Sequence, residues 1–139
     1  MFYFAYGSNM SHQQMKERCP SAHFLKRTYL ENFRFVYDGN SQKRRGSVAN
    51  IIKLSGNKVW GGLFEISVDN LATLDYYEGY PTSYNRAELD IKDDTGNSIT
   101  AVVYFHTNKD LGEPSEQYRK VILQGARDCG LPEEYIKSL

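Results

Sequence analysis

The chain has 139 residues, 40% of them hydrophobic and 24% charged, and its 17 basic side chains balance 17 acidic ones. This length suits one domain, residues 1–139, around one core, and no apolar run approaches the roughly 18 residues that a membrane span needs. A net charge of zero argues against nucleic acid or an anionic membrane as partner, so we expect a small-molecule ligand.

The N-terminal segment predicts a strand that runs through a polar turn into a helix. Residues 1–6 form a short apolar run, and the turn-forming cluster Gly7-Ser8-Asn9 follows it. Ser11 is placed to cap a helix that Pro20 closes, with Gln14 completing a capping box. Free N–H groups and the positive end of a helix dipole would then meet in this loop, where they suit a carboxylate or an oxyanion. Most such turns only connect elements, and no phosphate-binding glycine pattern is present.

Several strands are predicted in the middle of the chain. A strand-rich stretch covers residues 25–37, residues 38–46 have the composition of an exposed loop, and further strands are expected over 48–54 and 59–68. The basic run Lys43-Arg44-Arg45 in the loop is expected to be solvated.

A helix should follow, with Asp69 as its cap, Leu71 and Leu74 facing inward and Gly79 at its end. Beyond it, alternating apolar residues predict a hairpin made of residues 87–91 and 99–105.

The last long helix is predicted from a cap at Ser115 to a stop at Gly130, and a final turn is expected around residues 134–136. Together these elements predict an α+β fold, a small mixed and largely antiparallel β-barrel with flanking helices.

Glu78 is the candidate for acid–base chemistry, because it falls in the last turn of the helix that Gly79 ends. The helix dipole disfavours a negative charge there, and burial among the flanking residues Tyr76, Tyr77 and Tyr80 would add to the effect. Both would raise the pKa of Glu78 toward the range of a general acid or base. The alternative is a solvated surface glutamate. Asp75 is a competing carboxylate, more consistent with a structural role.

The cysteines and histidines do not indicate a metal or covalent site. Cys19 and Cys129 form no CxxC or His-flanked pattern, so we expect no disulfide framework and a reducing, cytoplasmic environment. The three histidines lack the spacing of zinc ligands, and no serine or cysteine has the sequence context of a nucleophile. No metal and no cofactor is expected.

Several segments together resemble the γ-glutamylcyclotransferase family. They are residues 4–10 (FAYGSNM), 59–61 (VWG), 74–79 (LDYYEG), 114–118 (PSEQY) and the stretch from Gly125-Ala126 to 131–135 (LPEEY). The segments are individually modest, but their order and spacing cover nearly the whole chain.

The resemblance implies a β-barrel enzyme that cyclises a γ-glutamyl amide to 5-oxoproline and releases an amino acid or amine. It implies Glu78 as the general acid/base. The residues that it implies for substrate binding are Tyr3, Phe4, Ala5, Tyr6, Gly7, Ser8, Asn9 and Tyr118. Residues 38–46 lack a recognisable family motif, which leaves the preference for the leaving group open.

Other functions remain open from the sequence. The same fold could serve as a non-catalytic module that binds a small ligand, or as a cyclotransferase for γ-glutamylamines or for a protecting group. A binder of single-stranded nucleic acid that uses the aromatic residues and Lys43-Arg44-Arg45 is a third alternative. The chain is expected to act as a monomer or a homodimer.

Overall fold

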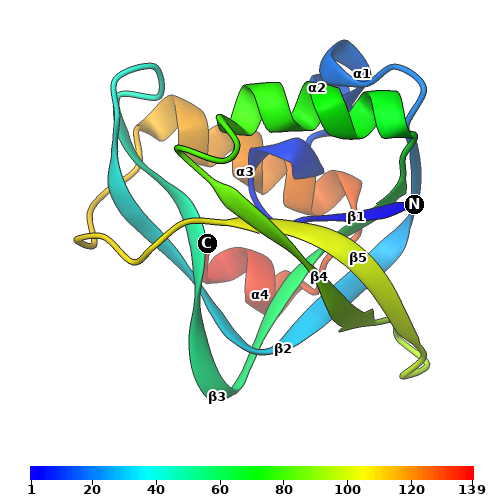
Figure 1. The fold of residues 1–139 in the computed structure, drawn as a ribbon. Coiled ribbons are helices and arrows are strands. Elements are labelled where there is room, and N and C mark those ends of the chain that lie inside the picture. Colours follow the sequence, from blue (N-terminus) through cyan, green and yellow to red (C-terminus); the bar gives the residue numbers. More distant parts are fainter.

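Five strands close into a barrel in the computed structural model, which describes all 139 residues (Figure 1). In chain order the elements are β1 (Phe2–Ala5), the 3₁₀ helix η1 (Ser8–Met10), α1 (His12–Arg18), β2 (His23–Ser41), β3 (Gly46–Glu65), α2 (Val68–Glu78), β4 (Asn85–Lys92), β5 (Ser98–Phe105), α3 (Glu116–Asp128) and α4 (Glu133–Lys137). Around the barrel the strand order is β1-β3-β2-β4-β5. The predicted α+β barrel with flanking helices is therefore confirmed.

The barrel is mixed because β1 lies between one antiparallel and one parallel neighbour. It pairs antiparallel with β3, for example Phe4 with Leu63, and parallel with β5 through Tyr3 and Val102. The other ladders are antiparallel, and β2 meets β4 through a single pair, Tyr29 and Lys92. The loop after β1 thus begins between β3 and β5.

The hairpin of β2 and β3 is longer than the sequence indicates. The exposed loop predicted over residues 38–46 is wrong for most of its length, since β2 continues to Ser41 and β3 begins at Gly46. Asp38 is fully buried and accepts a hydrogen bond from Asn50 on the partner strand, so a polar residue that looks like loop sequence belongs to the ladder. The strand break predicted near residues 55–57 is a local irregularity within β3.

Polar caps set the starts of the helices. Ser11 caps α1 by accepting a hydrogen bond from the backbone N–H of Gln14, as predicted. The Gln14 side chain does not complete the capping box, because it donates to Ser8 and Asn9 instead.

For α2 the predicted cap at Asp69 is wrong. Ser67 is the cap and forms a reciprocal capping box with Asn70. Val68, the last residue of the strand predicted over 59–68, therefore opens the helix instead and is 72% exposed. The stop is as predicted: Gly79 adopts a left-handed conformation (φ 65°), and α2 ends at Glu78.

Helix α3 packs against the segment after β1. Its buried residues are Tyr118, Ile122, Gly125 and Ala126. A Cβ at Gly125 would lie 2.6 Å from the carbonyl carbon of Met10, so only glycine allows this close approach. None of the helices is both long and apolar enough to cross a lipid bilayer.

Candidate active site

A small pocket opens where β1 runs into the 3₁₀ helix and α2 ends. Its walls come from β1, η1, β3, α2, β5 and α3 and from adjoining loop residues. The lining residues are Tyr3, Phe4, Tyr6, Gly7, Ser8, Asn9, Ala49, Glu78, Tyr84, Tyr104 and Tyr118. The space open to the centres of water molecules is about 50 Å³, several times the roughly 10–15 Å³ that one water needs.

The structure brings together eight of the nine site residues predicted from the sequence. The exception is Ala5, which is buried and pairs with Gly62 in the ladder of β1 and β3, outside the pocket lining. Three lining residues were not predicted: Ala49, Tyr84 and Tyr104. They lie on other elements and carry no local motif, so only the closure of the barrel identifies them.

Glu78 enters this pocket as the last residue of α2. Its carboxyl group makes no hydrogen bond and no ion pair within the protein, although eight ion pairs form elsewhere. The nearby Asp75, by contrast, pairs with Arg86 at 2.9 Å and accepts a hydrogen bond from Tyr104 at 2.6 Å. These contacts support the structural role predicted for Asp75, whereas the Glu78 carboxyl has no partner within the protein.

Burial raises the pKa of Glu78 to about 7, while the positive charges of Arg18 and Arg44 oppose the rise. The predicted direction is therefore right, but two of the three tyrosines predicted to bury Glu78 are exposed, and only Tyr80 packs against the core. Tyr76 is 81% exposed and Tyr77 is 44% exposed. The residues around the Glu78 carboxyl are instead pocket tyrosines that are distant in sequence, such as Tyr3 and Tyr118.

The tyrosines of the pocket are held in place by hydrogen bonds that leave some hydroxyl protons unused. Tyr118 accepts from the backbone N–H of Ala49 at 3.0 Å and donates to no protein atom. Tyr3 likewise accepts from the Asn9 amide at 3.0 Å. Burial raises the pKa of Tyr118 to about 12, so it stays neutral. Both hydroxyls can therefore donate to an oxygen atom of a ligand.

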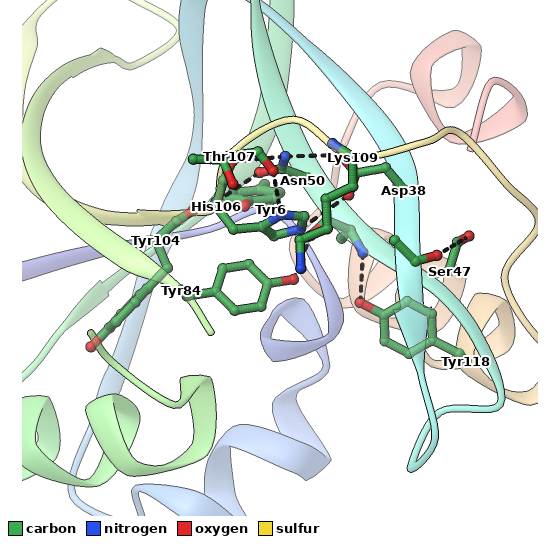
Figure 2. Close-up of polar contacts among 12 residues, drawn as sticks. Tyr6, Asp38, Ser47, Asn50, Tyr84, Tyr104, His106, Thr107, Lys109 and Tyr118 are labelled. Carbon is green, nitrogen blue, oxygen red and sulfur yellow. Dashed lines mark hydrogen bonds and ion pairs between the residues drawn. The ribbon is translucent and has the colours of Figure 1, made fainter. Parts of the chain in front are cut away.

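Tyr84 closes another side of the pocket. Its hydroxyl donates to the Ala49 carbonyl at 2.6 Å, so Ala49 holds both Tyr84 and Tyr118. Figure 2 shows these two tyrosines reaching toward the same region from opposite sides.

The loop after β1 contributes unpaired backbone donors. The N–H groups of Gly7, Ser8 and Asn9 make no hydrogen bond within the protein, and all three residues line the pocket. Donors of this kind at the start of a helical segment favour a carboxylate or a developing oxyanion. The loop thus has the free backbone N–H donors that the sequence predicts for it.

A buried polar cluster supports the pocket behind Tyr84 (Figure 2). Asp38 lies 3.0 Å from the His106 ring and accepts hydrogen bonds from the Asn50 side chain and the Lys109 backbone. The His106 ring packs edge-on against Tyr84, with 4.8 Å between ring centroids. The cluster lies outside the pocket lining and fixes the position of Tyr84.

Metal ligands and disulfides are not found among the 139 residues. No group of three or more His, Cys, Asp or Glu side chains is arranged to hold a metal ion. Cys19 and Cys129 are free, buried thiols.

Comparisons with known proteins agree on one family. The model of the AIG2-like family matches residues 58–139. A human γ-glutamylcyclotransferase is 37% identical over 99% of this chain and 76% of its own length.

Solved structures give the same result. A γ-glutamyl cyclotransferase superposes with a TM-score of 0.94 at 34% identity, over 99% of this chain and 85% of the other. YkqA from Bacillus subtilis has the same fold, with a TM-score of 0.84 at 22% identity over 99% of this chain and 52% of its own.

Proposed function

Since this chain belongs to the γ-glutamylcyclotransferase family, we propose that it converts a γ-glutamyl amide to 5-oxoproline with Glu78 as the group that moves the protons. The observation that carries the role of Glu78 is its unpaired carboxyl group in the pocket wall, with a pKa raised to about 7. A carboxyl group in that state can both accept and donate a proton near neutral pH.

The reaction requires no nucleophile from the enzyme. The α-amine of the γ-glutamyl group attacks its own γ-carbonyl carbon, closes a five-membered lactam, and the C–N bond to the leaving amine breaks. The pocket would hold the γ-glutamyl group folded back, with amine and carbonyl about 3–3.5 Å apart. The unpaired N–H groups of Gly7, Ser8 and Asn9 are suited to the α-carboxylate or the carbonyl oxygen of this group.

Proton transfer follows from the ionisation of Glu78. The ionised carboxylate would take a proton from the substrate's α-ammonium and so produce the attacking amine. As the C–N bond breaks, the protonated acid would give that proton to the departing nitrogen. The second proton that the attacking nitrogen loses on ring closure would pass by the same route, so the leaving group departs as an ammonium and Glu78 returns to its ionised state. Both steps are accessible to one group because a pKa of about 7 keeps both forms populated near neutral pH.

Charge that develops on the carbonyl oxygen needs donors, and Tyr118 is suited to supply one. Its hydroxyl already accepts from the Ala49 backbone, which orients its proton away from that strand. As a neutral phenol it donates without a change in ionisation.

The test is release of 5-oxoproline from γ-glutamyl-L-alanine by the wild-type protein and by two variants. Glu78→Gln should lose roughly 10²-fold or more in kcat, because it removes proton transfer and keeps the shape of the side chain. Asp75→Asn, on the same helix, should retain turnover. Near-normal activity of Glu78→Gln, or its loss only in Asp75→Asn, would refute the assignment.

A non-catalytic binding module is the alternative function on this fold. The unpaired Glu78 carboxyl favours the enzyme, since a desolvated acid without a partner costs stability and adds little to passive binding. We also propose the reducing cytoplasm as the compartment, because both thiols are free. Titration of two thiols in protein unfolded without reductant would support this location.

A further inference from the structure

A histidine lies directly across from the pocket residue Tyr84, at one end of the hairpin of β4 and β5. The last pair of the ladder at this end is Asn85 with Phe105. One step further in the same antiparallel register, Tyr84 stands opposite His106, and the two rings pack edge to face with 4.8 Å between their centroids. An imidazole ring is thus packed against a residue that lines the pocket.

The loop before Tyr84 does not fix its side chain. Residues 81–83 are exposed, and the backbone N–H groups of Thr82 and Ser83 donate only to the nearby Gly79 carbonyl. The Tyr84 hydroxyl is held at its tip, where it donates to the Ala49 carbonyl at 2.6 Å. The edge-on contact with the histidine restrains the ring itself.

The His106 ring is in turn held at both of its nitrogens. Nδ1 lies 2.9 Å from the carbonyl oxygen of Thr107, and because a carbonyl only accepts, Nδ1 carries a proton. Nε2 lies 3.0 Å from Oδ1 of Asp38, and the two side chains are only 5% and 1% exposed. No other protein atom bonds to Nε2 or to this Oδ1, so a shared proton holds the two together.

Asn50 fixes the backbone of the histidine to β3. Its side-chain oxygen accepts from the His106 N–H, and its amide group donates to the His106 carbonyl and to Oδ2 of Asp38, each at 3.1 Å. The same Oδ2 accepts from the backbone N–H of Lys109 at 3.2 Å. Figure 2 shows these side chains together beside the Tyr84 ring, where β2, β3 and the segment after β5 meet.

Tyr84 also helps to determine where Tyr118 lies. The Ala49 carbonyl accepts from Tyr84, and the N–H of the same residue donates to the Tyr118 hydroxyl at 3.0 Å. The two tyrosines are therefore bonded to one residue of β3, next to Asn50. A displaced Tyr84 would release the Ala49 carbonyl and with it the position of the Tyr118 hydroxyl.

Burial of Asp38 and His106 needs an explanation, because two apolar side chains of similar size would be less costly there. A buried polar network is favourable only in the geometry that makes its hydrogen bonds, so it selects one arrangement over close alternatives. The arrangement selected here includes the ring of Tyr84.

We propose that Asp38 and His106 are positioning residues for the cyclisation: together they hold Tyr84 and, through Ala49, the Tyr118 hydroxyl where the reaction needs them. The proposal rests on the proposed function. Neither residue lines the pocket, so their effect is exerted through the tyrosines. It falls on kcat, because the Tyr118 hydroxyl meets the charge on the carbonyl oxygen only as the ring closes.

The experiment removes the pair and compares it with a buried carboxylate elsewhere. Because His106→Leu alone leaves Asp38 buried without its partner, the double variant Asp38→Asn/His106→Leu, in which that side chain is neutral, is made beside it. Asp93→Asn is the matched control. Asp93 is buried, pairs with Lys26 at 2.8 Å and follows β4 at the opposite end of the same hairpin.

The double variant should lower kcat for release of 5-oxoproline from γ-glutamyl-L-alanine roughly 10- to 100-fold, the effect of a misplacement of about 1 Å. KM should change little, because the backbone N–H groups of residues 7–9 still bind the γ-glutamyl group. Asp93→Asn should lose stability in urea and keep its kcat. An unchanged kcat in the double variant, or an equal loss in Asp93→Asn, would overturn the proposal.

A double-mutant cycle tests whether the pair acts through Tyr84. In a Tyr84→Leu background, Asp38→Asn/His106→Leu should lower kcat by no more than about a further twofold. The Asn50 contacts stay in both backgrounds, since they go to the backbone of residue 106. A further loss as large as that in the wild type would show that the pair acts by another route.

A measurement without turnover separates this proposal from the proposed function. In protein with ¹³C-labelled tyrosine rings, the NMR signals of Tyr84 and Tyr118 are assigned with Tyr84→Leu and Tyr118→Phe. Both signals should shift in the double variant, while that of Tyr29, which packs on Trp60, should not. Unmoved Tyr84 and Tyr118 signals would overturn the positioning role. A wild type that released no 5-oxoproline from any γ-glutamyl amide would instead refute the proposed function.

Discussion

Replacing Glu78 by Gln should stabilise the folded protein at pH 8 while it removes turnover. Burial raises the pKa of Glu78 from 4.5 to about 7, so at pH 8 the folded protein holds a carboxylate that its surroundings disfavour. Each pKa unit corresponds to about 1.4 kcal/mol, and the cost of this ionisation is therefore about 3 kcal/mol. Gln has nearly the same shape and no charge, so the variant avoids that cost.

The sign of the effect sets its pH dependence. Because the pKa is higher in the folded than in the unfolded state, the wild type loses this stability as the pH rises from about 4.5 to about 7. The stabilisation by Gln should be close to zero at pH 4.5 and reach about 3 kcal/mol at pH 8. Urea unfolding of both proteins at the two pH values gives the free energies of unfolding directly.

A surface glutamate supplies the control. Glu88 is exposed and makes no ion pair, so Glu88→Gln should change the free energy of unfolding by no more than about 0.5 kcal/mol at either pH. The variant should gain more stability over the wild type at pH 8 than at pH 4.5. An equal gain at the two pH values would show that the folded state does not raise the pKa of Glu78.

Three further variants test the supports of the site. Asp75→Asn should weaken the ion pair with Arg86 and lower the free energy of unfolding in urea by about 1–3 kcal/mol, while turnover stays within a few-fold of the wild type. A large loss of turnover in the folded variant would contradict a purely structural role for Asp75. Tyr118→Phe should leave the buried N–H of Ala49 without an acceptor, at a cost of about 1–3 kcal/mol in the same assay, and an unchanged stability would show that the bond contributes nothing. Gly125→Ala should force α3 away from the loop after β1 and cost at least about 1–3 kcal/mol in thermal or urea unfolding; a normal melting temperature would refute that packing argument.

Local signals in the sequence were sufficient for the elements that begin and end within a few residues. The cap at Ser11 and the stop at Gly79 are set by single side chains and by one backbone conformation, and both are found as predicted. The stop at Gly79 is what places Glu78 at the very end of α2. The cap of α2 is harder to predict, because Asp69 and Ser67 can both cap a helix and only the reciprocal hydrogen bonds with Asn70 favour Ser67.

Features that depend on contacts between distant residues cannot be predicted from local patterns in the sequence. Asp38 has the character of a loop residue in the sequence, and only its hydrogen bond with Asn50 on β3 shows that it belongs to β2. The strand is longer as a result, and the turn at its end places Arg44 at the site. Tyr84 and Tyr104 line the pocket only because the barrel closes. That residues 1–139 form one domain remains a prediction, as do the roles of the site residues.

Contacts between distant residues also determine the surroundings of Glu78. Of the tyrosines beside Glu78 in sequence, Tyr76 and Tyr77 are exposed, whereas the pocket that holds Glu78 is lined by residues of β1, α3 and the segment before β4. The opposing charges of Arg18 and Arg44 could not be predicted either, since one comes from α1 and the other from the hairpin turn.

The pH dependence of kcat/KM for γ-glutamyl-L-alanine tests the central claim most directly, because it reports the ionisation of the essential base in the free enzyme. With Glu78 as that base, kcat/KM should fall about tenfold per pH unit on the acid side, with an apparent pKa near 7. An acid limb that stays flat to pH 5 would show that no group with the raised pKa of Glu78 accepts the proton.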